Sequence, residues 1–236
     1  VLFMGYGYYY DPTYILVVIG FIITLIAEIG VKGSYSKYKK INASKNITGR
    51  EVARKILDAN GLDNVQVKEV GGTLSDHYNP SDKTVNLSTD IYKDSSIASI
   101  AVAAHECGHA IQDKVGYKFL RLRHSIIPTV NICSNLGYFV VMIGLLFGSF
   151  NLAMAGFILL CTILVFQLVT LPVEFNASKR AKKELIKLNI ADKKDASGVK
   201  SMLLAAAMTY VASVFNTLLQ MLRMLLIILS SRRRDD

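Results

Sequence analysis

The chain has 236 residues, of which 52% are hydrophobic, and its lysines and arginines exceed its acidic residues by nine. Such a balance is compatible with a nucleic-acid-binding protein or with a membrane protein, but the hydrophobic residues are gathered in long uncharged runs. The basic residues lie beside those runs. We therefore expect a membrane protein that does not bind nucleic acid.

The first hydrophobic run, residues 14–31, carries one charge, Glu28, near its end. Its length suits a membrane-spanning helix, and no basic segment precedes it, which argues against a cleaved signal peptide. Lysines crowd the residues after the run, whereas Asp11 is the only charge before it. The positive-inside tendency then predicts a multi-pass protein of the cell membrane, with its N-terminus outside and residues 32–125 in the cytoplasm.

Two helices of this cytoplasmic segment have recognisable start signals. Thr48 and Glu51 have the spacing of a capping box, and apolar residues follow with helical periodicity. Asp94 or Ser95 offers a cap for a second helix, whose alanine-rich apolar run occupies residues 97–104. Both helices are expected to pack in the cytoplasmic domain.

Alternating apolar and polar residues at 65–70 and 84–88 predict two strands with a turn at 79–82 between them. The strand at 84–88 either offers an exposed edge that aligns an extended peptide substrate or belongs to an ordinary packed hairpin. His77, on the loop between the strands, and Asn86, in the second strand, are candidate contacts to a substrate or a reaction oxyanion. A solvent-exposed histidine with no role is the alternative.

The sequence HECGH at 105–109 is the most specific chemical signal in the chain. On a helix, His105 and His109 project from one face, close enough to share an ion, and Zn²⁺ accepts imidazole nitrogens. Glu106 then lies where its carboxylate reaches a water at the open coordination position rather than the ion. The motif predicts a zinc-dependent hydrolase with Glu106 as general base. Two buried histidines satisfied by hydrogen bonds are the alternative.

Two further uncharged runs, residues 126–148 and 152–173, are joined by a short turn and predict a transmembrane hairpin. The hairpin returns the chain to the cytoplasmic side, where Glu174 begins a polar helix. A catalytic zinc usually has three protein ligands, and the residues after His109 lack the third histidine of the extended HExxHxxGxxH pattern. Glu174 is the candidate third ligand, and a charge at a helix N-terminus, favoured by the helix dipole, is the alternative.

The last apolar run, residues 201–230, has a polar stripe of Asn216, Gln220 and Arg223 on one helical face. Arginine near the middle of a span costs at least ~2.5 kcal/mol, so this face should meet protein, a water-filled groove or lipid headgroups. A crossing would also place the arginines at 232–234 outside, against the positive-inside tendency. A fourth span and an interfacial helix with a cytoplasmic tail both stay open.

The remaining reactive side chains have simpler interpretations. Cys107 occupies a variable position of the HExxH motif and is expected to pack rather than to bind metal, while Cys133 and Cys161 lie inside predicted spans. None of the three is expected to form a disulfide. His124, next to Arg123, is expected in a basic cluster at the membrane boundary and not at the zinc.

Four segments carry a resemblance to a known family: DPTY at 11–14 with the Tyr-rich residues before it, SDHY at 75–78, AAHECGHAIQ at 103–112 and LPVEFNAS at 171–178. They resemble the YugP-like membrane zinc metallopeptidases, a family related in plan to the HtpX membrane proteases. In the HtpX-like group the third zinc ligand begins a Glu-aromatic-x-Ala-Asp motif after a transmembrane hairpin, which matches Glu174, Phe175 and Ala177. Ser178 replaces the Asp, so this position supplies no carboxylate behind the ligands.

Together these features predict a mainly α-helical membrane protein with a small α+β zincin-like domain around the HExxH helix. The expected segments are an anchor at 1–31, a cytoplasmic domain at 32–125, a transmembrane hairpin at 126–173, a cytoplasmic helix at 174–200 and a C-terminal helix with a basic tail at 201–236. The expected function is a zinc endopeptidase in the lipid bilayer that acts on peptides or proteins, including membrane-associated ones. A scaffold with a structural zinc and a hydrolase of non-peptide bonds are the alternatives.

Overall fold

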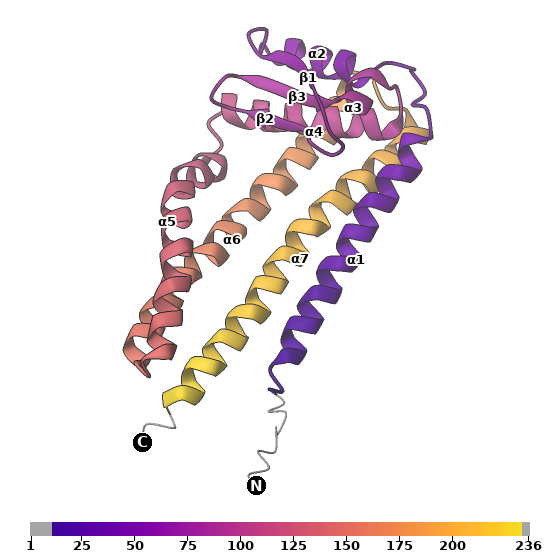
Figure 1. Cartoon of the computed structure of the whole chain (residues 1–236). Coiled ribbons are helices and arrows are strands. Elements are labelled where there is room, and N and C mark those ends of the chain that lie inside the picture. The colour runs from indigo at the N-terminus through magenta and orange to yellow at the C-terminus, as the bar shows by residue number, and fades with distance from the viewer. Residues whose placement is uncertain (1–10, 233–236) are drawn as a thin grey trace.

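The computed structural model describes residues 11–232, which fold into a compact cap and a set of long helices (Figure 1). In chain order the elements are α1 (Tyr14–Lys39), α2 (Gly49–Ala59), β1 (Gln66–Val70), β2 (His77–Asn79), β3 (Thr84–Ser88), α3 (Thr89–Lys93), α4 (Ile97–Lys114), α5 (Lys118–Leu146), α6 (Phe150–Lys187) and α7 (Lys193–Arg232). The Tyr-rich segment within residues 1–10 and the arginines at 233 and 234 lie outside the described residues.

The helices α1, α5, α6 and α7 are long and apolar enough to cross a membrane, judged by length and composition. They contain the three predicted spans and also the uncertain C-terminal run. Figure 1 shows all four extending from the cap, with the start of α1, the α5–α6 turn and the end of α7 far from the sheet. Because α7 lies alongside α1 rather than across the helices, the structure favours a fourth span over an interfacial helix.

Two residues of the polar stripe of α7, Asn216 and Arg223, are half-buried against other helices, whereas Gln220 is exposed. Asn216 packs against α1 at Gly20, where a β-carbon would lie 2.3 Å from the Asn216 amide oxygen, and Gln220 donates a 3.2 Å hydrogen bond to that oxygen. The Arg223 guanidinium lies 3.4 Å from the Asp11 carboxylate and 4.4 Å from the centre of the Tyr14 ring. These contacts reduce the cost of an arginine in an apolar helix.

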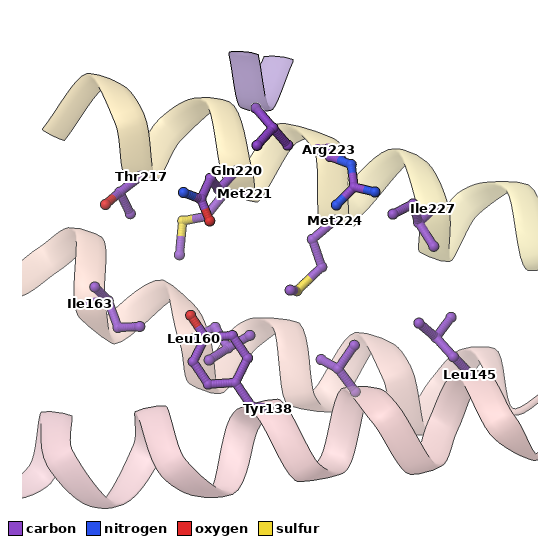
Figure 2. Close-up of a pocket in the computed structure, with 12 residues that line it drawn as sticks. Tyr138, Leu145, Leu160, Ile163, Thr217, Gln220, Met221, Arg223, Met224 and Ile227 are labelled. Atoms are coloured by element: carbon purple, nitrogen blue, oxygen red, sulfur yellow. The ribbon is translucent and has the colours of Figure 1, made fainter. Parts of the chain in front are cut away.

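Gln220 and Arg223 also border a cavity of about 330 Å³ between α7 and the α5–α6 hairpin. Figure 2 shows the polar residues of α7 opposite Tyr138 and Leu160 on the hairpin. Hydrophobic side chains such as Leu145, Ile163 and Met224 complete the lining. The polar face of α7 therefore meets α1 and the interior of the helix group.

The hairpin of α5 and α6 is held together by small residues at close backbone contacts. A β-carbon on Gly144 would lie 2.3 Å from the backbone nitrogen of Ala153, and one on Gly156 would lie 2.5 Å from that of Val141. Small residues allow such approach between helices that cannot use the hydrophobic effect within lipid. The turn contains Gly148 at φ +67°, a left-handed conformation that glycine adopts without steric cost.

The helix that carries Glu174 differs from the predicted one. Instead of beginning at Glu174, it is the continuous 38-residue helix α6, with Pro172 inside it. A proline removes one backbone donor but need not end a helix whose neighbours hold it in place. The change to polar residues at 174 therefore marks the end of the apolar surface, not a new helix.

The sheet has the order β1-β3-β2, with β1 parallel and β2 antiparallel to β3. The hairpin prediction was therefore wrong, and so was a substrate-aligning role for Thr84–Ser88, because β3 has partners on both sides. His77–Asn79, expected on a loop, is instead the edge strand β2. A three-residue strand is too short to show an alternating pattern, and parallel pairing depends on long-range contacts.

The cap comprises α2, α3, α4 and the sheet. Within it, α2 and the sheet pack around α4, whose residues from Ile97 to Gln112 are mostly buried. The capping box of Thr48 and Glu51 is confirmed, with both reciprocal hydrogen bonds formed. The N-cap residue of α4 is Ser96, one residue beyond the predicted pair, and its hydroxyl accepts a hydrogen bond from the backbone N–H of Ser99. The HExxH motif thus lies in the middle of a well-anchored buried helix.

Candidate zinc centre and active site

Three potential metal ligands converge where α4 crosses α6. His105 and His109, one turn apart on α4, have their Nε2 atoms 3.2 Å from each other. The Oε2 atom of Glu174, on α6, lies 3.3 Å from the His105 Nε2 and 3.6 Å from that of His109. Among the described residues these three form the candidate metal group, and all are wholly or largely buried.

The spacing of these atoms fits a zinc ion. Bonds of about 2.0–2.2 Å to nitrogen and oxygen in a tetrahedral arrangement put neighbouring ligand atoms roughly 3.3–3.6 Å apart. The three separations between the candidate ligand atoms, 3.2, 3.3 and 3.6 Å, fall at or next to this range. Two neutral imidazoles and one carboxylate are also a usual donor set for catalytic zinc, which keeps a fourth position open. Glu174 thereby lies beside the two histidines as predicted, although 64 residues separate it from His109 in the sequence.

Gly108, a variable position of the HExxH motif, sets how closely α4 approaches α6. A β-carbon there would lie 2.6 Å from the Ala177 carbonyl oxygen and 3.2 Å from the Ala177 Cα, both backbone atoms that cannot rotate away. The absence of a side chain therefore brings the histidines of α4 within reach of Glu174.

We expect Gly108→Ala to destabilise the fold and weaken zinc binding together. Alanine normally favours a helix over glycine by up to about 1 kcal/mol, but here the forced separation of α4 and α6 should cost about 1–3 kcal/mol. Thermal unfolding with and without zinc measures both effects. Gly33→Ala is a suitable control, because a β-carbon at Gly33 meets nothing within 4 Å. Equal or greater stability of Gly108→Ala would contradict this role of the crossing.

Each histidine has a hydrogen-bond partner on its other ring nitrogen. Ser178 Oγ lies 3.2 Å from the His105 Nδ1, so Ser178 places a hydroxyl behind this candidate ligand. Gln112 Oε1 lies 3.1 Å from the His109 Nδ1. Such partners fix the orientation and tautomer of a metal-binding imidazole.

Gln112 also connects the two ligand-bearing helices. It is completely buried, and its amide nitrogen donates to the Val173 carbonyl oxygen at 2.8 Å and to the Asn176 side-chain oxygen at 3.1 Å. Arg180, one turn further along α6, donates to the same Asn176 oxygen at 2.8 Å. One side chain thus orients His109 and holds α4 against the turn of α6 that carries Glu174.

The carboxylate of Glu174 has a partner from a third helix. Arg123 of α5 places a guanidinium nitrogen 3.2 Å from Oε1, whereas Oε2 faces the two histidines. This cation neutralises part of the carboxylate charge and fixes its orientation. The membrane-boundary cluster was predicted for His124, and the contact of its neighbour Arg123 with Glu174 was not predicted, because a sequence does not show which basic residue reaches across to α6.

We expect Gln112→Leu to weaken zinc binding by about 10–100-fold, the usual effect of removing a partner behind a metal ligand. Leucine keeps a side chain of similar size in the buried position but can neither orient His109 nor bond to α6. Competition with a zinc-binding dye measures the affinity. Gln66→Leu, at an exposed position of β1, is the matched control and should retain wild-type affinity. An unchanged affinity of Gln112→Leu would show that Gln112 only fills space.

Glu106 lies next to His105 on α4 and lines the same cavity as His105 and Glu174. Burial raises the pKa of its carboxyl to about 7, whereas the charge of His105 and the backbone N–H of Tyr78 act in the opposite direction. A carboxyl with a pKa near neutrality suits a group that must both accept and release a proton. The cationic charge of a bound metal would lower this pKa and favour the carboxylate.

The edge strand β2 is fixed beside α4. The Tyr78 hydroxyl donates a 2.7 Å hydrogen bond to the Asp113 carboxylate on the last turn of α4, and Lys83 forms an ion pair with the same carboxylate. At the other end, Asp76 accepts from the backbone N–H and the hydroxyl of Ser88. β2 therefore runs past Glu106 with one edge free of strand partners.

Among the described residues, His77 and Asn86 contact each other and do not belong to the candidate metal group. The Asn86 side-chain amide is 3.3 Å from the His77 Nε2, and the His77 Nδ1 is 2.8 Å from the Ser75 carbonyl oxygen. Neither residue is among those that line the cavity beside Glu106. A role in contacting substrate stays a prediction for both.

A model of the family described as "Putative neutral zinc metallopeptidase" matches residues 13–229. The chain belongs to this family. It is also 46% identical over 206 residues to the "Putative membrane protease YugP" of Bacillus subtilis (strain 168), an alignment that covers 87% of this chain and 92% of the relative. No solved structure matches the chain significantly. Membership of this family implies that the chain binds zinc. The similarity to a membrane protease, together with the four long apolar helices among the described residues, indicates that the chain is a membrane protein.

Proposed function

We propose that this family member is an integral-membrane zinc endopeptidase with a zincin-like catalytic domain. The observation that carries the proposal is the convergence of His105, His109 and Glu174 at zinc-ligand spacing, with Glu106 lining the cavity next to them. A buried HExxH helix beside a sheet with an antiparallel edge strand supports the same assignment.

In this proposal Glu106 moves the protons. When bound, zinc acidifies a water molecule and polarises the carbonyl group to be attacked. The Glu106 carboxylate accepts a proton from the water as its oxygen bonds to the scissile carbonyl carbon. Glu106 then gives this proton to the amide nitrogen as the C–N bond breaks, so that the products are a carboxylic acid and an amine. Arg123, Ser178 and Gln112 keep the three ligands oriented throughout.

A structural zinc site in a non-catalytic scaffold is less well supported. Such a site would be closed by a fourth protein ligand, and His77 and Cys107 are the candidates from the sequence. Cys107 is directed toward the Ala53 carbonyl oxygen at 3.6 Å, and His77 bonds to Ser75 and Asn86. Among the described residues, neither belongs to the candidate metal group.

We further propose that the substrate is an extended peptide paired with β2, because β2 presents a free strand edge beside Glu106. With the lysines after α1 on the inside, the cap faces the cytoplasm. A cysteine introduced at the exposed Asn64 tests the orientation. A membrane-impermeant thiol reagent should label it in inverted vesicles but not in intact cells, and the reverse pattern would place the cap outside.

Metal removal tests the proposed activity. The purified full-length chain in lipid nanodiscs should cleave unfolded casein, lose this activity after treatment with a zinc chelator, and regain it when Zn²⁺ is added. The reason is that the water and the carbonyl are activated only with the metal in place. Cleavage that persists in the chelator, or a zinc-loaded protein that cleaves no peptide bond, would contradict the proposal.

A further inference from the structure

The cavity that contains Glu106 has two chemically different sides. Its polar side holds His105, Glu106 and Glu174, and the whole cavity has a volume of about 140 Å³. An apolar protein cavity of about 150 Å³ can hold one benzene molecule, so a space of this size suits a single side chain rather than a longer segment. The proposed zinc chemistry explains the polar side of the cavity but not its other lining residues.

The opposite wall of the cavity comes mainly from the membrane helix α7. Leu203, Ala206, Ala207 and Tyr210 are spaced i, i+3, i+4 and i+7, which places them on one helical face, and all four line the cavity together with Met202. Two adjacent alanines between larger residues leave room where bulkier side chains would fill the space. The size of the cavity is therefore set by α7.

Two further side chains, both apolar, complete this wall, whose polar group is the Tyr210 hydroxyl that interacts with the Glu174 carboxylate. Val31 belongs to α1, and Leu74 to the loop between β1 and β2. Leu74 is 42% exposed and has φ +57°, a conformation that a leucine rarely adopts. Leu74 therefore adds an exposed apolar side chain to this wall of the cavity.

The charges around the cavity favour an uncharged occupant. Its described lining residues include no lysine or arginine that could pair with an acidic side chain. Asp76 is a lining acid that could attract a basic side chain, but both of its oxygens are within 3.1 Å of the Ser88 hydroxyl and one also accepts from the Ser88 backbone. Glu106 and Glu174 are committed to the chemistry.

We propose that this cavity receives the apolar side chain of the residue flanking the scissile bond, and that α7 determines which side chains fit. The inference rests on the proposed peptidase function, and it deepens it by naming the substrate class: peptides with a medium-sized aliphatic residue at the cleavage site. A membrane helix then acts as the specificity wall of a site whose catalytic groups lie on α4 and α6.

Amino-acid hydroxamates test the pocket without requiring catalysis, because their two oxygens chelate the metal while the side chain is free to enter the adjacent space. With the full-length zinc-loaded chain, leucine hydroxamate should bind at least about 10-fold more tightly than glycine hydroxamate, as expected for filling an apolar pocket. Ala207→Phe should fill the pocket and remove this preference. Ala206→Leu should reduce it if Ala207→Phe does not fold.

Ala205→Phe is the matched control, because Ala205 borders an apolar groove between α7 and α1 instead of the cavity. It should keep the leucine preference. Glycine hydroxamate, which needs no side-chain pocket, reports whether each variant still binds metal. Met202→Ala should enlarge the pocket and shift the preference toward phenylalanine hydroxamate.

Equal affinity of the wild-type chain for the two hydroxamates would overturn the inference, as would an effect of Ala205→Phe as large as that of Ala207→Phe. These results are separable from a failure of the proposed function. A leucine preference without casein cleavage would leave the pocket and remove the peptidase, whereas casein cleavage without a leucine preference would do the opposite.

Discussion

The Glu106→Gln variant should lose proteolysis while keeping zinc. General acid–base catalysis by a positioned carboxylate contributes about 10²–10⁴-fold, and an amide of the same shape cannot accept the proton from the attacking water. Glu106 is not part of the candidate ligand group, so the metal site should stay intact. Because burial already disfavours the ionised carboxyl, the neutral amide should not unfold the helix.

Casein cleavage and zinc content, measured on the same preparation, check this prediction. Glu69→Gln, at an exposed position of β1, is the control for the substitution itself and should retain activity. A Glu106→Gln protein with normal zinc and normal cleavage would remove Glu106 from the mechanism. A variant that loses its zinc would show instead that Glu106 belongs to the coordination sphere.

The Glu174→Ala variant should lose the metal itself. Removing a partner behind a ligand typically lowers metal affinity about 10–100-fold. Removing a ligand itself should lower zinc affinity by more than this. The change also leaves the Arg123 guanidinium without its carboxylate in a partly buried position, which adds a loss of stability. Both the zinc content of the purified protein and its thermal unfolding temperature should fall.

Glu184→Ala separates loss of a ligand from loss of a buried glutamate. Glu184 lies ten residues further along α6, is also buried, and accepts a 3.0 Å hydrogen bond from Asn60. Its replacement should lower stability but leave zinc binding unchanged. Zinc binding by Glu174→Ala at the wild-type level would exclude Glu174 as the third ligand.

The parts of the structure that the sequence predicted well depend on short-range signals. Helical spacing within the HExxH motif brings His105 and His109 together, and the capping box of Thr48 starts α2 as expected. The two uncharged runs and the short turn between them are short-range signals as well. They were enough to predict that Glu174 lies on the same side of the membrane as the two histidines. Long uninterrupted apolar runs likewise predicted the three spans that lie within α1, α5 and α6.

The parts that could not be predicted depend on contacts between distant segments. Whether β3 pairs with one strand or two is decided by the path of the chain from β1 to β3 and not by alternation within 84–88. The partners behind the candidate ligands also depend on distant segments: Ser178 on α6 contacts His105 on α4, where Gly108 allows the two helices to approach closely. Gln112 did offer a local signal, since a residue three positions after His109 shares its helical face.

Zinc coordination measured by X-ray absorption on the purified full-length chain tests most directly whether α4 and α6 assemble a catalytic zinc centre. The spectrum should show four nitrogen or oxygen neighbours at about 2.0–2.2 Å, two of them imidazoles, with water supplying the position that the protein leaves open. A sulfur neighbour at about 2.3 Å, a third imidazole, or a spectrum unchanged by Glu174→Ala would contradict this centre.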